Sequence, residues 1–311
     1  MSTASTISNV TFMKPEKFYL SGFYNVPRVE YIYIFLCFVY IMTVVGNVLL
    51  LSVIFLVKTL HTPKYMIVFN LALTDLCGST ALIPKVLDTF LFGNRYIVYE
   101  GCLCQVFFVM FFGSVQSWTL VTMAYDRFIA ICFPLRYHSI VTKPAVAVML
   151  LFAWAVLLSL ISCMVGLLDR LSFCGSLVIQ SFFCDHGALY QLPCNDKSIN
   201  RNIVFLYVTI VFLFPLILIA LTYVCIAIAL TLKTCTSHLI LVAIFYFPLL
   251  GTSATVLTSS LHPNARMVNS TLTHVIPALL NPIIYSLNKA QALWLTIIRR
   301  ASCTSWNTAS L

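Results

Sequence analysis

Charged side chains are scarce in this chain of 311 residues. Only 9% of the residues are Asp, Glu, Lys or Arg, whereas 61% are hydrophobic. Soluble domains carry about 25% charged residues, so the composition excludes a soluble protein and makes the lipid bilayer the solvent. The first 30 residues are mostly polar and contain five charges, unlike a cleavable signal peptide. We therefore expect the first apolar run to direct membrane insertion.

Charge is also missing from long stretches within the chain. A helix needs about 20 apolar residues to cross a bilayer, and six runs of this kind contain no charged residue. They are bounded by Glu30 and Lys58, Glu100 and Asp126, Lys143 and Asp169, Arg201 and Lys233, Lys233 and Arg266, and Arg266 and Lys289. A seventh run, between Lys64 and Lys85, contains only Asp75.

These seven runs predict an all-α membrane protein, a seven-transmembrane helix bundle. We expect an extracellular tail over residues 1–28, the bundle over residues 29–288 and a cytoplasmic segment over residues 289–311. Residues 289–300 combine three cations and a Trp with apolar residues. This pattern predicts a short C-terminal amphipathic helix on the inner leaflet.

Catalytic and metal-binding sets are absent from the apolar runs. Cys102 and Cys104 have no His/Cys pair nearby in the sequence, and Cys235 with His238 falls short of the three or four protein ligands that zinc requires. No nucleophile and base pair is legible, so we expect no enzyme, no metal and no cofactor. A transporter that uses Asp75 as an ion relay is the rival interpretation, but transporters tend to contain internal repeats and several embedded charges, which this chain lacks.

Cysteines and a sequon predict the orientation better than positive charge does. With the N-terminus outside, nine Lys/Arg face each side, which is a tie. Cys102, Cys174, Cys184 and Cys194 all fall on one side, and disulfides require an oxidising compartment. The glycosylation acceptor Asn9 lies on that side too. We therefore predict a plasma-membrane glycoprotein with an extracellular N-terminus, whose basic balance reflects the cytoplasmic surface and needs no nucleic acid.

Two motifs end the third and seventh apolar runs. The third ends in MAYDRFIAIC (residues 123–132), followed by PLRY (residues 134–137), and the seventh ends in NPIIY (residues 281–285). Asp126 and Arg127 can hold each other until another protein's backbone competes for the guanidinium, which has five donors. On spacing alone, this pair could equally be a boundary anchor for the helix.

Together these motifs resemble those of the odorant receptors, a branch of the rhodopsin-like G-protein-coupled receptors. The resemblance covers the chain from about residue 20 to residue 300. The resemblance implies sensory transduction: a small-molecule odorant binds and a heterotrimeric G protein of the stimulatory, olfactory type is activated. It also implies the disulfides Cys102–Cys184 and Cys174–Cys194, although the sequence alone allows other pairings.

The resemblance further implies a ligand pocket among the outer halves of helices three, five, six and seven. Its apolar, hydroxyl and imidazole side chains suit a small, mostly apolar ligand. The pocket residues would be Val109, Met110, Gly113, Ser114, Tyr207, Val211, Tyr246, Leu249, Leu250, Ser253, Thr271 and His274. The inner activation switch would consist of Asp126, Arg127, Tyr223, Asn281, Pro282 and Tyr285.

The chain departs from the family pattern at two places. Odorant receptors often place a Glu eleven residues before the signature Arg, where this chain has Gln116. With one carboxylate in place of two, we expect Asn47, Asp75, Gln116 and Asn281 to form a hydrogen-bonded polar network in preference to a sodium site. The link between the fifth and sixth helices is also about a dozen residues shorter than usual, which leaves a folded but weakly coupling receptor as an alternative.

Overall fold

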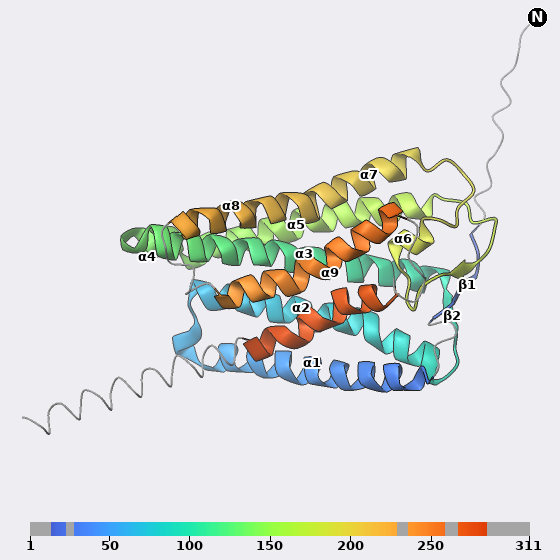
Figure 1. The fold of residues 1–311 in the computed structure, drawn as a ribbon, viewed down its shortest axis with the longest axis horizontal. Helices are drawn as coiled ribbons and strands as arrows, with labels where there is room; N and C mark the ends of the chain where they lie inside the picture. The colour runs from blue at the N-terminus through green and yellow to red at the C-terminus, as the bar shows by residue number, and fades with distance from the viewer. Residues whose placement is uncertain (1–13, 23–27, 229–235, 259–266, 285–311) are drawn as a thin grey trace, which may run out of the picture.

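The computed structural model describes residues 14–22, 28–228, 236–258 and 267–284. Within these residues, seven long helical segments form an elongated bundle (Figure 1). In chain order they are α1 (Glu30–Leu56), α2 (Pro63–Leu91), α3 (Tyr99–Cys132), α5 (Lys143–Asp169), the continuous run of α7 (Ser198–Val208), η3 (Thr209–Leu213) and α8 (Phe214–Ile228), then α9 (Thr236–Thr258) and a helix over residues 267–284. Four short helical pieces lie between them: η1 (Lys58–Leu60), η2 (Pro134–Arg136), α4 (Tyr137–Ile140) and α6 (His186–Leu189).

The outside of the bundle is apolar. Five described segments, namely α1, most of α2, α3, α5 and the α7–α8 run, are long and apolar enough to cross a membrane. Along α1 alone, Phe35, Phe38, Leu49 and Phe55 are each more than half exposed. Contiguous apolar surface of this extent is rare on soluble monomers, so these side chains face lipid.

Prolines shape several helices. Pro63 begins α2, where its missing N–H has no intrahelical partner to lose. Pro84 lies inside α2 and Pro248 inside α9. Pro215 lies just after η3, which is a turn of π-helix, so the fifth span contains a widened turn.

A three-stranded sheet covers one end of the bundle, in the strand order β2-β1-β3. The strand β1 (Lys17–Leu20) lies between β2 (Tyr96–Val98), to which it runs antiparallel, and β3 (Val178–Ile179), to which it runs parallel. Figure 1 shows this sheet end, with α6 beside it, opposite the end that contains α4. The strand β1 lies within residues 1–28, for which the sequence predicted an extracellular tail and no strand.

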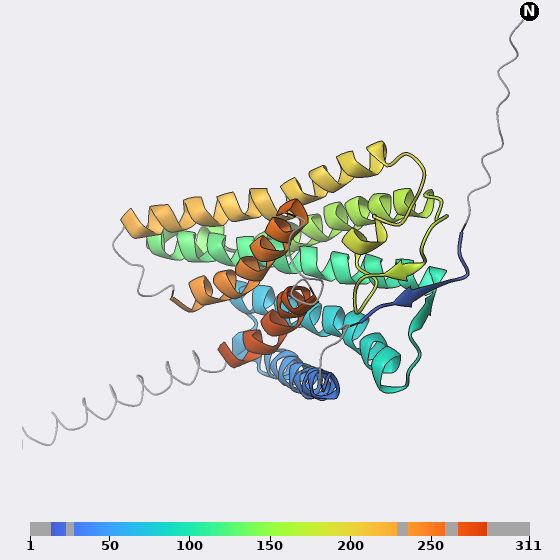
Figure 2. The same cartoon turned by 45° about the vertical axis from the view of Figure 1, so that its right-hand side comes forward.

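Polar side chains join the helices inside the apolar bundle. Asn70 of α2 donates to Thr119 Oγ1 of α3 at 2.8 Å and accepts from Trp154 Nε1 of α5 at 3.0 Å. The 267–284 helix lies beside α1 (Figure 2), where a Cβ at Gly46 would be only 3.2 Å from Pro282 Cβ. Glycine therefore permits the close approach that lets the neighbouring Asn47 amide reach this helix.

Candidate functional site

A small cavity lies in the middle of the bundle. Its volume is about 40 Å³, and its walls come from α2, α3, η3, α9 and the 267–284 helix. It is lined by Gly78, Val109, Gly113, Gln116, Phe212, Phe245, Leu249, Thr273 and His274. A Cβ added at Gly113 would meet no atom within 4 Å, so this glycine leaves the α3 wall bare.

Four of the pocket residues expected from the sequence line this cavity: Val109, Gly113, Leu249 and His274. The lining residues that sequence reasoning missed are Gly78, Gln116, Phe212, Phe245 and Thr273. Helical spacing could have found one of them, since residues 109, 113 and 116 follow one face of α3 at steps of four and three.

The other pocket residues expected from the sequence are not among the residues that line this cavity. The Ser114 hydroxyl lies 3.4 Å from the Tyr207 hydroxyl, which joins α3 to α7. Met110 is partly buried and packs in the cluster around Phe111, and Thr271 donates to the Met267 carbonyl at 2.9 Å. Leu250 is 53% exposed on α9. The side chain of Ser253 falls outside the described residues.

Ser117 joins three helical segments beside the cavity. Its hydroxyl donates to the Val211 carbonyl at 2.6 Å, and the Tyr246 hydroxyl lies 2.7 Å away. In an α-helix the N–H of residue 215 would bind that carbonyl, but Pro215 has no N–H. Since the single Ser117 proton goes to Val211, Tyr246 donates to Ser117. The expected pocket residues Val211 and Tyr246 are thus held by one hydroxyl of α3.

Asp75 is the centre of a buried polar network. Its carboxylate is fully buried and accepts from Gln116 Nε2 at 2.9 Å and from Asn281 Nδ2 at 2.7 Å, one donor for each oxygen. The Asn47 amide instead donates to the carbonyls of Thr43 and Ala278 at 2.9 and 3.0 Å. Neutral amides therefore supply the donors that a carboxylate needs when it is buried.

No metal cluster was found among the described residues, since they contain no group of three or more His, Cys, Asp or Glu placed to hold one. Among the residues that the structure describes, both side-chain hydrogen bonds to the Asp75 carboxylate come from amides. The arrangement is that of a hydrogen-bonded network.

The end of the bundle that contains α4, opposite the sheet end, contains two polar contacts around Asp126 and Arg127. Arg127 Nη2 lies 3.3 Å from Asp126 Oδ2, and Tyr137 of α4 donates to Asp126 Oδ1 at 2.7 Å. Burial, followed by this hydrogen bond to a carboxylate, raises the pKa of Tyr137 to about 12. The Asp126 carboxylate is therefore bound by Arg127 through one oxygen and by a neutral phenol through the other. The residue is buried, with 3% of its surface exposed.

Tyr223 of α8 is hydrogen-bonded to His238 Nδ1 of α9, and both rings are buried. This contact fastens the fifth and sixth helical spans near Arg127. Sequence reasoning placed Tyr223 in the switch and considered His238 only as a zinc ligand. Asn281 and Pro282 are buried, whereas Tyr285, Asn9 and residues 289–311 lie outside the described residues.

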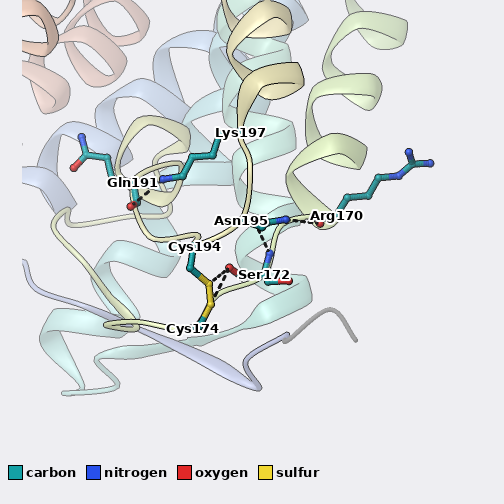
Figure 3. The surroundings of a disulfide bond; sticks show 7 residues. All are labelled: Arg170, Ser172, Cys174, Gln191, Cys194, Asn195 and Lys197. Carbon is teal, nitrogen blue, oxygen red and sulfur yellow. Dashed lines mark hydrogen bonds between the residues drawn. A yellow bond between two sulfur atoms is a disulfide. The ribbon is translucent and has the colours of Figure 1, made fainter. Parts of the chain in front are cut away.

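The sheet end is fastened by two disulfides. Cys102 of α3 is bonded to Cys184, and Cys174 is bonded to Cys194 within the loop that follows α5. These are the pairs that the family resemblance implied. Figure 3 shows the second disulfide, where Asn195 Oδ1 accepts from the backbone N–H of Ser172 at 3.0 Å.

The loop held by these disulfides reaches the cavity. Phe183, next to Cys184, is fully buried and makes an edge-on contact with the His274 ring at a centroid distance of 5.5 Å. The Cys184 N–H donates to Gln105 Oε1 at 3.0 Å, which adds a second link to α3. The loop therefore forms part of the environment of a cavity-lining side chain.

Among solved structures, squid rhodopsin is similar in fold. The two align with a TM-score of 0.69 at 17% identity, over 85% of this chain and 79% of the rhodopsin chain. At this identity the likeness shows the fold alone. The protein has the seven-helix fold of the rhodopsin-like receptors, which confirms the predicted seven-helix bundle.

Sequence comparison then identifies the family. A family model described as olfactory receptor matches residues 36–302. Olfactory receptor 1 of Rattus norvegicus is 36% identical, covering 80% of this chain and 82% of the rat protein. Olfactory receptor 1J1 of Homo sapiens is 34% identical, covering 80% of each chain. The chain belongs to the olfactory receptor family. It is therefore a multi-pass membrane protein of the G-protein-coupled receptor class and not an enzyme.

Proposed function

We propose that this receptor binds a small, neutral, mostly apolar odorant in the cavity beside Gly113 and His274. The observation that carries the proposal is the bare α3 wall at Gly113, where an added Cβ would meet no atom within 4 Å. Gln116, Thr273 and His274 contribute polar groups, and none of the described side chains lining the cavity is charged. This chemistry suits an alcohol, ketone, aldehyde or ester with one hydrogen-bonding group on an apolar body.

The ligand must widen the cavity. Sites for small molecules usually have volumes of about 300–1,000 Å³, whereas this cavity has about 40 Å³. Leu249, Phe245 and His274 line it and could make room by rotamer changes and small helix shifts. A ligand that binds only the widened form shifts the population toward it, and this shift is the proposed trigger.

The widening of the cavity would shift α9 and the η3–α8 run, which are both hydrogen-bonded to Ser117 of α3, and these helices extend to the end of the bundle that contains Arg127. We infer that the sheet end is extracellular, because both disulfides lie there and require an oxidising compartment. The Arg127 end then faces the cytoplasm and a heterotrimeric G protein of the stimulatory type. Movement of α9 away from α8 would separate Tyr223 from His238 and expose Arg127.

A weakly coupling receptor is the second candidate. The described part of α8 ends at Ile228 and that of α9 begins at Thr236, so only the seven residues 229–235 lie between them. A short connection restrains the separation of two antiparallel helices. The receptor would then bind odorants and signal with low amplitude.

A cell-based screen tests the proposal. We would measure cyclic nucleotide production against a broad panel of neutral odorants, with surface staining for delivery, in the native chain and in Gly113→Leu. The Leu side chain fills the cavity, so we expect the response to be lost while surface staining persists. The matched control is Gly166→Leu on α5, where an added Cβ also meets no atom within 4 Å but the residue is exposed.

The two variants separate filling of the cavity from a general effect of a new leucine. The control should respond like the native chain. An unchanged odorant profile for Gly113→Leu at normal surface levels would move the binding site elsewhere.

A further inference from the structure

A second hollow lies on the outside of the bundle at the sheet end. This groove has a volume of about 430 Å³, roughly ten times the 40 Å³ of the cavity beside Gly113. Its walls include Ala81 and Lys85 of α2, Ile97 and Val98 of β2, and Gln105 and Phe108 of α3. Its volume is within the range of sites that bind small molecules.

The groove extends from the sheet into the apolar part of the bundle. Val98 and Phe108 are 46% and 44% exposed, and Cys104, which also lines the groove, is exposed. Phe108 lies nine residues into α3, about 13 Å along the helix axis from its start at Tyr99. A molecule in the groove would therefore touch both the membrane boundary and the acyl-chain region.

Cations stand at the rim of this apolar groove. The ammonium of Lys85 donates to Asp88 Oδ2 at 2.5 Å, and Asp88 also accepts from Asn94 at 3.2 Å. Lys17 Nζ lies 4.9 Å from the ring centroid of Tyr96, which is another lining residue. The same Nζ lies 3.7 Å from Glu16 Oε1.

Each ammonium has three donors, so one carboxylate partner leaves donors for an incoming anion. Cationic groups at the boundary above an apolar wall match the two halves of an acidic amphiphile.

We propose that this groove binds an amphiphile with an anionic head group and an acyl chain. The head group binds at Lys85, and the chain lies along Val98 and Phe108. A free fatty acid and an anionic phospholipid share this chemistry. This site is separate from the odorant cavity, so it does not depend on the proposed odorant site.

Occupancy of the groove would be communicated to the loop. Gln105 lines the groove and accepts from the Cys184 N–H at 3.0 Å, and its Nε2 donates to the Ala81 carbonyl at 3.4 Å. The residue before Cys184, Phe183, contacts His274 of the odorant cavity. An amphiphile that shifts Gln105 would therefore modulate odorant responses through the disulfide-bonded loop.

Cys104 provides a direct reporter of occupancy. Its free thiol is exposed on the groove wall, and Cys163 on α5 is an exposed free thiol elsewhere on the bundle. We would purify the full chain in uncharged detergent, treat it with N-ethylmaleimide and follow both cysteines by peptide mass spectrometry, with oleate or oleyl alcohol added. At about ten times its dissociation constant, oleate should slow Cys104 labelling about tenfold by mass action, while Cys163 labelling stays unchanged.

The charge at Lys85 gives the sharper comparison. Oleyl alcohol has the same chain without the anion and should protect Cys104 only weakly. Lys85→Gln should raise the oleate concentration for half protection about tenfold and make the two compounds alike. Ala81→Trp, which fills the groove, should remove protection by both. Thermal melting and Cys163 labelling verify that each variant is folded.

Nanodiscs distinguish the sources of the ligand. Protection of Cys104 on adding phosphatidylserine to phosphatidylcholine nanodiscs would identify a membrane lipid, whereas protection by oleate alone would identify a free fatty acid. Either result supports the site. The proposal is overturned if oleate leaves Cys104 labelling unchanged, or if oleate and oleyl alcohol protect equally in both the native chain and Lys85→Gln.

Discussion

The Ser117 hydroxyl of α3 is hydrogen-bonded to both η3 and α9. It donates to the Val211 carbonyl at 2.6 Å and lies 2.7 Å from the Tyr246 hydroxyl. All three residues are buried, so no water replaces a lost partner. A buried polar group left without its partner costs about 1–3 kcal/mol. This residue therefore holds the π-turn and α9 in register with α3.

Ser117→Ala should lower the free energy of unfolding by about 1–3 kcal/mol, since it leaves both the Val211 carbonyl and the Tyr246 hydroxyl unpaired. The measurement is thermal melting of purified receptor. Ser159→Ala is the matched control, because the Ser159 hydroxyl is exposed and bonds only within α5, to Ala155. Equal melting temperatures for Ser117→Ala and the native chain would show that this hydroxyl stabilises nothing.

At the scale of elements, the strand β1 is stabilised by backbone hydrogen bonds to the loops on either side of it. Tyr19 donates to the Leu177 carbonyl at 2.9 Å and Leu20 to the Arg95 carbonyl at 3.0 Å, so both flanking loops hold it. Its Phe18 side chain is fully buried, with ring centroids 5.2 Å from Phe173 and 5.9 Å from Tyr99. The strand thus fastens the N-terminal segment to both loops at the sheet end.

Phe18→Ala should release β1 from the sheet, because truncating a buried Phe costs about 3–5 kcal/mol. Hydrogen–deuterium exchange over residues 17–20 should accelerate at least about a hundredfold. Tyr19→Ala, on the exposed face of the same strand, should change exchange little. Slow exchange in Phe18→Ala would show that backbone pairing alone holds the strand.

The connection between α8 and α9 is the second feature at this scale. Seven residues, 229–235, separate Ile228 from Thr236, and the proposed outward movement of α9 would lengthen the distance that they span. We predict that inserting about twelve flexible, basic residues after Leu232 raises odorant-stimulated signalling. Relief of a restraint of about 1 kcal/mol increases the active population about fivefold.

Odorant affinity should change little in the inserted chain, since the cavity lies in the middle of the bundle. The same twelve residues added after Leu311 serve as the control for length and charge. Signalling is compared at matched surface expression. Identical amplitudes in the inserted and native chains would mean that the short connection does not restrain α9.

At the scale of the whole molecule, the sheet end is closed by cross-links from distant parts of the chain. The Cys102–Cys184 disulfide joins residues 82 positions apart, and Lys14 pairs with Asp169 at 2.7 Å. Tyr99 donates to the same Asp169 at 3.0 Å. The N-terminal strand segment, α3 and the loop after α5 are therefore linked to one another above the central cavity.

Cys184→Ser should abolish the odorant response and reduce surface delivery. The loss of a native disulfide costs about 2–5 kcal/mol, and here it also frees the loop that carries Phe183. Surface staining and dose–response curves are the measurements, with Cys163→Ser, an exposed free thiol on α5, as the control. Normal curves from Cys184→Ser would show that the disulfide is dispensable for binding.

The sequence by itself determined the class of the molecule. The bilayer sets the length of each apolar run, so spacing of charges alone predicts seven spans. Short motifs around Arg127 and Asn281 identify the family because they stand at defined positions relative to those spans. The partners of Asp75 were also predictable in part: of the amides expected in its network, Gln116 and Asn281 donate to the carboxylate, whereas Asn47 donates to backbone carbonyls.

Only the tertiary structure decided which side chains meet. Thr273, and not Thr271, lines the cavity, because each residue turns the helix by about 100° and rotation about the helix axis is set by packing against neighbours. The strand β1 exists through hydrogen bonds to carbonyls of Arg95 and Leu177, which are distant in the sequence. Register, rotation and long-range pairing depend on contacts that form between segments, and local sequence pattern does not contain them.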